Sequence, residues 1–85
     1  MKKIIISPTM EGLKKAFVKF GFEAYLKQTP YISKLSVLNK SKKQIDIVFD
    51  KVVNEFAVLS EDRRYFGITS LQEVVSKSMS LLKGS

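Results

Sequence analysis

The chain contains no cysteine, no histidine and no tryptophan. Without cysteine there is no disulfide framework, and without cysteine or histidine a zinc or haem site has neither thiolate nor imidazole ligands. The same absences exclude the serine–histidine and cysteine–histidine pairs that activate nucleophiles in many hydrolases. We therefore expect no metal site, no cofactor and no enzymatic activity.

Long apolar runs are also missing. The run Ile4–Ile6 follows two lysines, as in a signal peptide, but it is only three residues long. An export signal needs about 7–15 apolar residues and a membrane span about 18. We therefore expect a cytoplasmic protein that contacts no membrane. With 45% hydrophobic residues in a chain of 85, we expect a single folded domain over residues 1–85 rather than a disordered chain.

The charge is mostly of one sign. The chain has 15 cationic and 8 acidic residues, a net charge of +7, and every cation except Arg63 and Arg64 is a lysine. The excess lies in the first half, where residues 1–43 hold ten lysines against Glu11 and Glu23. This asymmetry favours attraction to a polyanion or to an acidic protein surface. The alternative is a solvated lysine surface that keeps a small protein soluble.

The first 27 residues predict a strand followed by a helix. Lys3–Ser7 is a short branched-aliphatic run that a proline ends, as in a buried strand. A helix is predicted over Met10–Lys27, because apolar residues recur there at helical spacing. These residues are Leu13, Phe17, Phe20 and Ala24. Gly21 lies within this pattern and leaves open a helix that ends near Phe20.

The middle of the chain predicts a hairpin. Apolar and polar residues alternate around Leu35 and again around Ile47, so we expect two half-buried strands of a 33–50 hairpin joined by Asn39–Lys43. The next apolar positions fit a helical period over Lys51–Leu59, with a third strand as the main alternative. Residues 60–67 either prolong that helix to a glycine cap or form a connecting turn.

The last segment predicts a helix that begins at a capping box, Ser70 to Glu73. Its apolar face consists of Leu71, Val75, Met79 and Leu82. The resulting order, β-α-β-β-α-α, predicts the α+β fold class. We expect a single small domain with a three-stranded sheet that includes the 33–50 hairpin and has the helices packed on one face.

Two short motifs are typical of chemistry that we do not expect here. Ser80–Lys83 matches the Ser-x-x-Lys pattern of serine acyl enzymes, but the companion motifs are missing, and Lys83 suits the C-terminal end of a helix dipole. Asn39–Ser41 matches a glycosylation sequon. Because there is no export signal, we interpret this sequon as a hairpin turn.

The candidate nucleic-acid-binding residues are Lys34, Lys40, Lys42, Lys43, Lys14, Lys15, Lys19, Arg63, Arg64 and Tyr65. The lysines of the hairpin, extended by those of the first helix, act as point charges toward phosphate. In the third group a tyrosine adjoins two arginines, a combination that stacks on an unpaired base. The alternative is that Phe66 lies in the core and Arg63 pairs with Glu61 or Glu55.

Two functions fit this pattern. The leading hypothesis is a small, basic, non-enzymatic accessory protein that binds the backbone of nucleic acid, RNA or single-stranded DNA before a specific duplex. The alternative is a protein-binding inhibitor or adaptor. Its basic face would dock on an acidic partner such as a nucleic-acid enzyme, and the composition is typical of small accessory proteins such as those of phages.

The predicted first helix has more apolar surface than one face of a sheet covers. Its apolar residues are Leu13, Phe17, Val18, Phe20, Phe22, Ala24 and Tyr25. A homodimer through this helix would bury the second face. The alternative is that a later helix of the same chain covers it.

Overall fold

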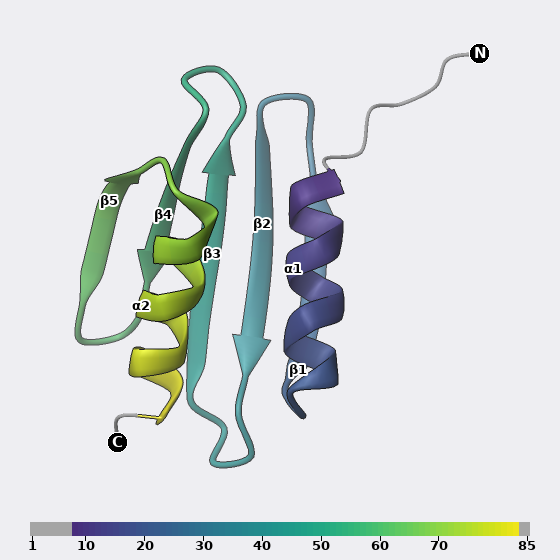
Figure 1. Cartoon of the computed structure of the whole chain (residues 1–85), viewed down its shortest axis with the longest axis vertical. Helices are drawn as coiled ribbons and strands as arrows, with labels where there is room; N and C mark the ends of the chain where they lie inside the picture. The colour runs from purple at the N-terminus through teal and green to yellow at the C-terminus, as the bar shows by residue number, and fades with distance from the viewer. Residues whose placement is uncertain (1–7, 84–85) are drawn as a thin grey trace.

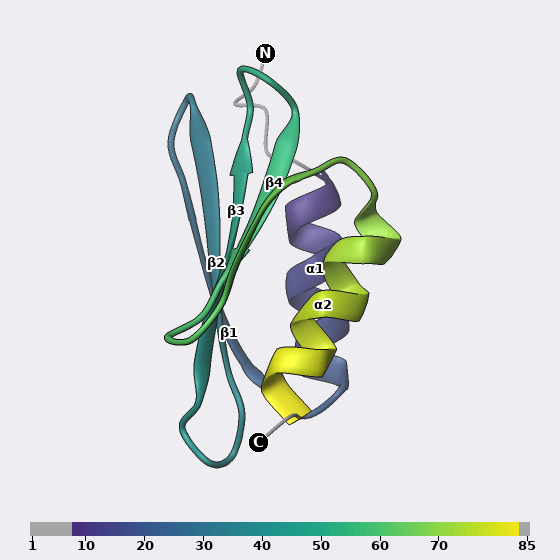
Figure 2. The ribbon, with the colours of Figure 1, turned by 90° about the vertical axis from the view of Figure 1, so that its left-hand side faces the viewer.

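The computed structural model describes residues 8–83 and has one antiparallel sheet with two helices on one face (Figure 1, Figure 2). The elements are α1 (Pro8–Lys19), β1 (Glu23–Gln28), β2 (Ile32–Leu38), β3 (Gln44–Asp50), β4 (Glu55–Leu59), β5 (Arg64–Ile68) and α2 (Leu71–Lys83). The five strands lie in sequence order, so they form a meander. α1 covers β1 and β2, and α2 covers β3 to β5. Within residues 8–83, no helix covers the other face, which we call the open face.

This arrangement is a small α+β domain, but the predicted order and the three-stranded sheet are wrong. The structure has two helices and five strands, in the order α-β-β-β-β-β-α. The 33–50 hairpin is present as β2 and β3, with Leu35 opposite Ile47. The strand predicted over Lys3–Ser7 lies outside the described residues.

The first helix is shorter than the segment Met10–Lys27, because Gly21 ends it. The N–H of Gly21 donates to the Val18 carbonyl at 3.0 Å, and the N–H of Phe22 donates to the Phe17 carbonyl at 3.0 Å. Gly21 has φ of 98°, in the left-handed region that favours glycine. These are the bonds of a Schellman motif, which caps the last carbonyls of a helix. The chain then leaves as strand β1.

The helix predicted over Lys51–Leu59 is also wrong, because residues 51–54 form a turn and β4 follows. The Asp50 carboxylate accepts a hydrogen bond from the N–H of Val52 at 2.9 Å, as at a helix start, but Asn54 then has φ of 59° and reverses the chain. In β4, Phe56 and Val58 are buried. Val52 and Val53, which would belong to the apolar face of a helix, are exposed.

The segment 60–67 neither prolongs a helix nor serves only as a turn. Ser60 and Arg63 close a tight turn, with the Ser60 N–H donating to the Arg63 carbonyl at 2.7 Å, and β5 follows. The pairing of β4 with β5 is irregular between Phe56 and Val58. Gly67, with φ of 68°, lies at this irregularity. A glycine in this conformation is typical of a β-bulge.

The core lies between the sheet and the two helices. Its buried residues are Met10, Leu13, Phe17, Ala24, Leu35, Val37, Ile45, Ile47, Phe56, Val58, Ile68, Val74, Leu81 and Leu82. The surface from which we predicted a homodimer through the first helix is therefore not present as such, because several of its apolar residues are core and the segment is not one helix. In the part of the chain that the structure describes, no helix is long and apolar enough to cross a bilayer.

The last helix is present, and Ser70 caps it as predicted. The Ser70 hydroxyl accepts a hydrogen bond from the N–H of Glu73 at 3.3 Å. The Glu73 carboxylate lies 3.8 Å from the ammonium of Lys77. The buried face differs from the predicted one: it consists of Val74, Ser78, Leu81 and Leu82, with Val75 and Met79 half-buried and Leu71 exposed.

Replacing Ser70 by alanine is expected to lower the free energy of unfolding by about 1 kcal/mol, because the N–H of Glu73 no longer has its acceptor. Urea denaturation followed by circular dichroism measures the change. Thr69→Ala is the matched control, since Thr69 is an exposed neighbouring hydroxyl residue, and it should change little. Equal decreases in the two variants would contradict the assignment of Ser70 as the cap.

Candidate nucleic-acid interface

The lysine-rich hairpin tip is held in place by one asparagine. The Asn39 side-chain oxygen accepts hydrogen bonds from the N–H groups of Ser41 and Lys43, at 2.8 Å and 3.0 Å. Its amide nitrogen donates to the carbonyl of Leu82, in the last turn of α2, at 2.7 Å. Asn39 thus shapes the turn and ties it to a helix that is distant in sequence. This supports our interpretation of the sequon as a turn.

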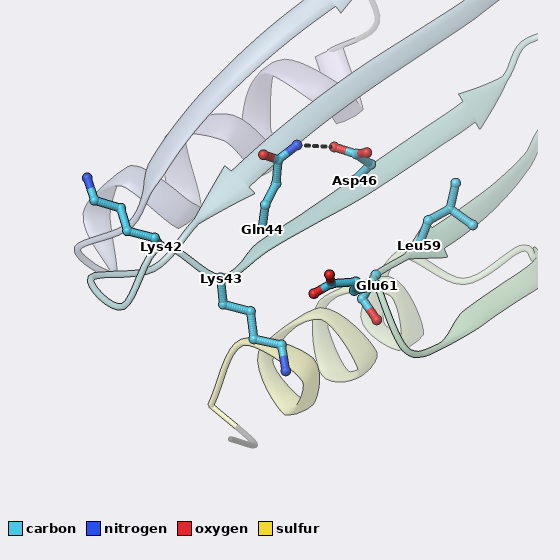
Figure 3. A pocket seen from close by; sticks show the side chains of 7 residues that line it. Lys42, Lys43, Gln44, Asp46, Leu59 and Glu61 are labelled. Carbon is cyan, nitrogen blue, oxygen red and sulfur yellow. Dashed lines mark hydrogen bonds between the residues drawn. The ribbon is translucent and has the colours of Figure 1, made fainter.

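The side chains of Lys42 and Lys43, two of the three lysines of the tip, point in different directions. Lys40 and Lys42 are exposed, whereas Lys43 is half-buried. Lys42 has φ of 69°, in the left-handed region. Figure 3 shows that Lys42 leaves the hairpin on one side, whereas the Lys43 side chain extends on the other side toward α2. The tip therefore presents ammonium groups on both of its sides.

Both helices end at the same end of the sheet as this hairpin (Figure 1). Lys19 is the last residue of α1 and Lys83 the last of α2. The structure thus brings together five lysines from three segments, which we call the basic end: Lys19, Lys40, Lys42, Lys43 and Lys83. Sequence reasoning missed Lys83 as a member, because its position at a helix C-terminus already explained it.

The hairpin supplies most of the uncompensated charge of the basic end. Within residues 8–83, the ammonium groups of Lys19, Lys40, Lys42 and Lys43 have no carboxylate within 4.0 Å. The two lysines at helix ends lie where the helix dipole is negative, so part of their charge offsets that dipole. The hairpin lysines offset no such dipole.

A shallow hollow of about 370 Å³ lies beside the tip, between β3 and the β4–β5 turn (Figure 3). Lys42, Lys43, Asp46 and Glu61 are among the residues that line it. The Asp46 carboxylate accepts hydrogen bonds from Ser36 at 2.8 Å and from Gln44 at 3.0 Å. Because both signs of charge meet here, the hollow is poorly suited to hold a phosphate, and we place the candidate surface at the lysines themselves.

The structure separates the other predicted lysines from the basic end. Lys34 lies on the open face of β2, because its neighbours Ser33 and Leu35 are buried on the helix side. Lys14 and Lys15 lie on α1, on the opposite side of the sheet, around a shallow surface that also includes Val18. The predicted lysine patch is therefore spread over two faces and one end.

The segment Arg63–Tyr65 does not form one surface. Arg63 lies in the β4–β5 turn and Arg64 is exposed at the start of β5. Tyr65 is half-buried on the helix side, where the Lys77 ammonium lies 4.5 Å from its ring centre. The exposed aromatic residue is Phe66, which is 69% accessible, so the alternative that Phe66 is core is wrong. Among residues 8–83, Arg63 has no carboxylate partner, so that part of the alternative is wrong too.

Comparison with models of protein families, with curated proteins and with solved structures finds no significant match. Among residues 8–83, no group of three or more acidic side chains is placed to hold a metal ion.

Proposed function

We propose that this protein is a non-enzymatic accessory protein that binds the backbone of nucleic acid through the basic end. The observation that carries the proposal is the convergence of lysines from α1, the β2–β3 hairpin and α2 at one end of the sheet. Lysine binds phosphate as a point charge, and no arginine, the residue that reads base edges, lies in the β2–β3 hairpin or in the last turn of either helix. Recognition of this kind tolerates any sequence and depends on salt.

RNA and single-stranded DNA are the ligands we favour over duplex DNA. The hairpin tip is narrow and carries ammonium groups on both sides. A flexible strand adapts to such a turn, whereas the phosphates of a duplex lie in fixed rows. The hairpin tip carries no aromatic side chain, so we expect phosphate contacts rather than base stacking to supply its share of the affinity.

The test is a titration of the whole protein with labelled RNA and DNA single strands of about 15 nucleotides, at about 50 mM and about 200 mM salt. Three to five phosphate contacts predict a fall in affinity of about 20-fold to about 100-fold between these concentrations. Fluorescence anisotropy measures both affinities. Absence of binding at the lower salt concentration, or an affinity independent of salt, would contradict the proposal.

A second candidate function, an inhibitor or adaptor that binds a protein, is favoured by the opposite end of the molecule. The exposed apolar residues there are Tyr31 and Ile32, at the start of β2, and Val52 and Val53, in the β3–β4 turn. The Lys51 N–H donates to the Tyr31 carbonyl at 2.8 Å and joins these two segments. Exposed apolar side chains that gather in one place are typical of protein interfaces. A protein complex that survives nuclease treatment, with no binding to either oligonucleotide, would favour this function.

The cytoplasmic location that the sequence predicts stays a prediction.

A further inference from the structure

The two edges of the sheet differ in their capacity to accept another strand. β5 has five residues, an irregular pairing with β4 and a glycine in the left-handed region. Such irregularities protect an edge against further pairing. β1 has six residues in unbroken register with β2 and contains neither glycine nor proline. Within residues 8–83, β1 pairs with β2 alone, so no other described strand bonds its outer side.

The hydrogen-bonding groups on this outer side can be assigned from the ladder. The Thr29 N–H donates to the Ile32 carbonyl at 2.8 Å, in line with the β1–β2 register. Hydrogen-bonded pairs alternate along an antiparallel ladder. Lys27, Tyr25 and Glu23 therefore bond to β2, whereas the backbone groups of Ala24, Leu26 and Gln28 point outward. These three residues offer a regular row of donors and acceptors.

We propose that two copies of this chain associate through antiparallel pairing of their β1 strands, with a two-fold axis at Tyr25. In this register Ala24 exchanges hydrogen bonds with Leu26 of the second copy. On the open face, Glu23 lies opposite Lys27 of the second copy, and the symmetry makes this ion pair twice. The outer edge of β1 is thus complementary to itself in both hydrogen bonding and charge.

A repulsion between two lysines within one copy supports a second copy of the chain as the partner of β1. Lys27 lies directly opposite Lys34 in the β1–β2 pair, on the same open face. Like charges in this position repel each other. In the dimer, Glu23 of the second copy flanks Lys27 on its other side and offsets the repulsion. The charge of the sheet face is therefore better balanced in the dimer than in one copy.

The charges also select one register. If the second strand slides by two residues, Lys27 lies opposite Tyr25 and Glu23 lies opposite Thr29, so neither ion pair forms. In the selected register the two Tyr25 side chains meet at the axis, and each is 59% accessible in one copy. The Tyr25 hydroxyl donates to the Glu23 carboxylate at 3.0 Å. This bond and the charge of Glu23 raise the pKa of Tyr25, so the phenol is neutral at physiological pH.

The test is sedimentation velocity of the full chain between about 5 and about 300 µM, with three charge variants. The native chain is expected to show a dimer within this range. Glu23→Lys and Lys27→Glu should each raise the dimer dissociation constant about 30-fold or more, because both symmetry-related pairs become repulsive. The double variant, Glu23→Lys with Lys27→Glu, restores both pairs with exchanged signs and should return the constant to within a few-fold of the native value.

Two of the variants distinguish a loss of folding from a loss of association. Lys27→Glu places a carboxylate opposite Lys34, so the fold of one copy should be at least as stable as before. Glu55→Lys makes the same change of net charge as Glu23→Lys at an exposed residue of β4 and should leave the dimer unchanged. Circular dichroism confirms that each variant is folded.

Three results would overturn the proposal. One is a native chain that stays monomeric at the highest concentration. Another is a folded double variant that does not recover the dimer. The third is protection of the Ala24, Leu26 and Gln28 amides from hydrogen exchange that does not depend on concentration, because the edge would then be covered within one copy.

Discussion

Replacing Lys40, Lys42 and Lys43 together by glutamine is expected to weaken binding to a single-stranded oligonucleotide about 100-fold at about 0.1 M salt. Each phosphate of a single strand that the protein no longer neutralises reduces the slope of log affinity against log salt by about 0.7, so three such phosphates reduce it by about 2. Because Lys40 and Lys42 are exposed, and because Asn39 rather than any lysine side chain shapes the turn, the fold should be unaffected. Anisotropy titrations at several salt concentrations measure both quantities.

The matched control removes the same charge from other places. Lys14, Lys15 and Lys34 lie outside the basic end, two on α1 and one on the open face. Their triple replacement by glutamine leaves the same net charge as the first variant. Long-range attraction falls equally in the two variants, whereas only the first variant removes ammonium groups from the basic end. Equal weakening of binding in both would show that net charge, and not the basic end, determines the affinity.

Replacing Phe17 by alanine is expected to lower the free energy of unfolding by about 3–5 kcal/mol. Phe17 is fully buried, and its ring lies 6.3 Å from that of Phe20 and 6.1 Å from that of Phe22, between centroids. A domain of this size has a total stability of only about 4–13 kcal/mol. The variant should therefore lose a large part of this stability, and urea denaturation measures the decrease.

Phe20→Ala is the matched control for Phe17→Ala. The two phenylalanines are three residues apart, and the helical spacing of the sequence predicts both on one apolar face. In the structure α1 ends at Lys19, and Phe20 is 55% accessible. Its removal gives up mainly one edge-to-face ring interaction, worth about 1 kcal/mol. A destabilisation as large as that of Phe17→Ala would contradict the end of α1 at this position.

Local patterns were sufficient for the hairpin and for the last helix. Leu35 and Ile47 belong to runs of strict alternation, and a strand with one buried face has this period regardless of what covers it. At the last helix, Ser70 and Glu73 are neighbours along the chain, so the hydrogen bond between them needs no tertiary partner. The absence of cysteine and histidine likewise excluded whole classes of chemistry from composition alone.

The segment 51–68 needed the tertiary structure. Val52, Val53 and Phe56 fit a helical period, but helix and strand compete closely in a short apolar segment. β3 decides the outcome, because it supplies the ladder for β4 and places Phe49 against Phe56, with ring centroids 4.6 Å apart. β4 in turn supplies the ladder for β5. A strand is stable only when a neighbouring strand bonds its backbone.

The sequence by itself determined that this chain is small and lysine-rich, has a charged hairpin and contains neither cysteine nor histidine. Only the tertiary structure decided which lysines act together. Lys34 is closer in sequence to the hairpin tip than Lys83 is, yet Lys83 belongs to the basic end and Lys34 to the open face. The physical reason is that strand alternation turns Lys34 away, while Asn39 binds the last turn of α2 and brings its end to the tip.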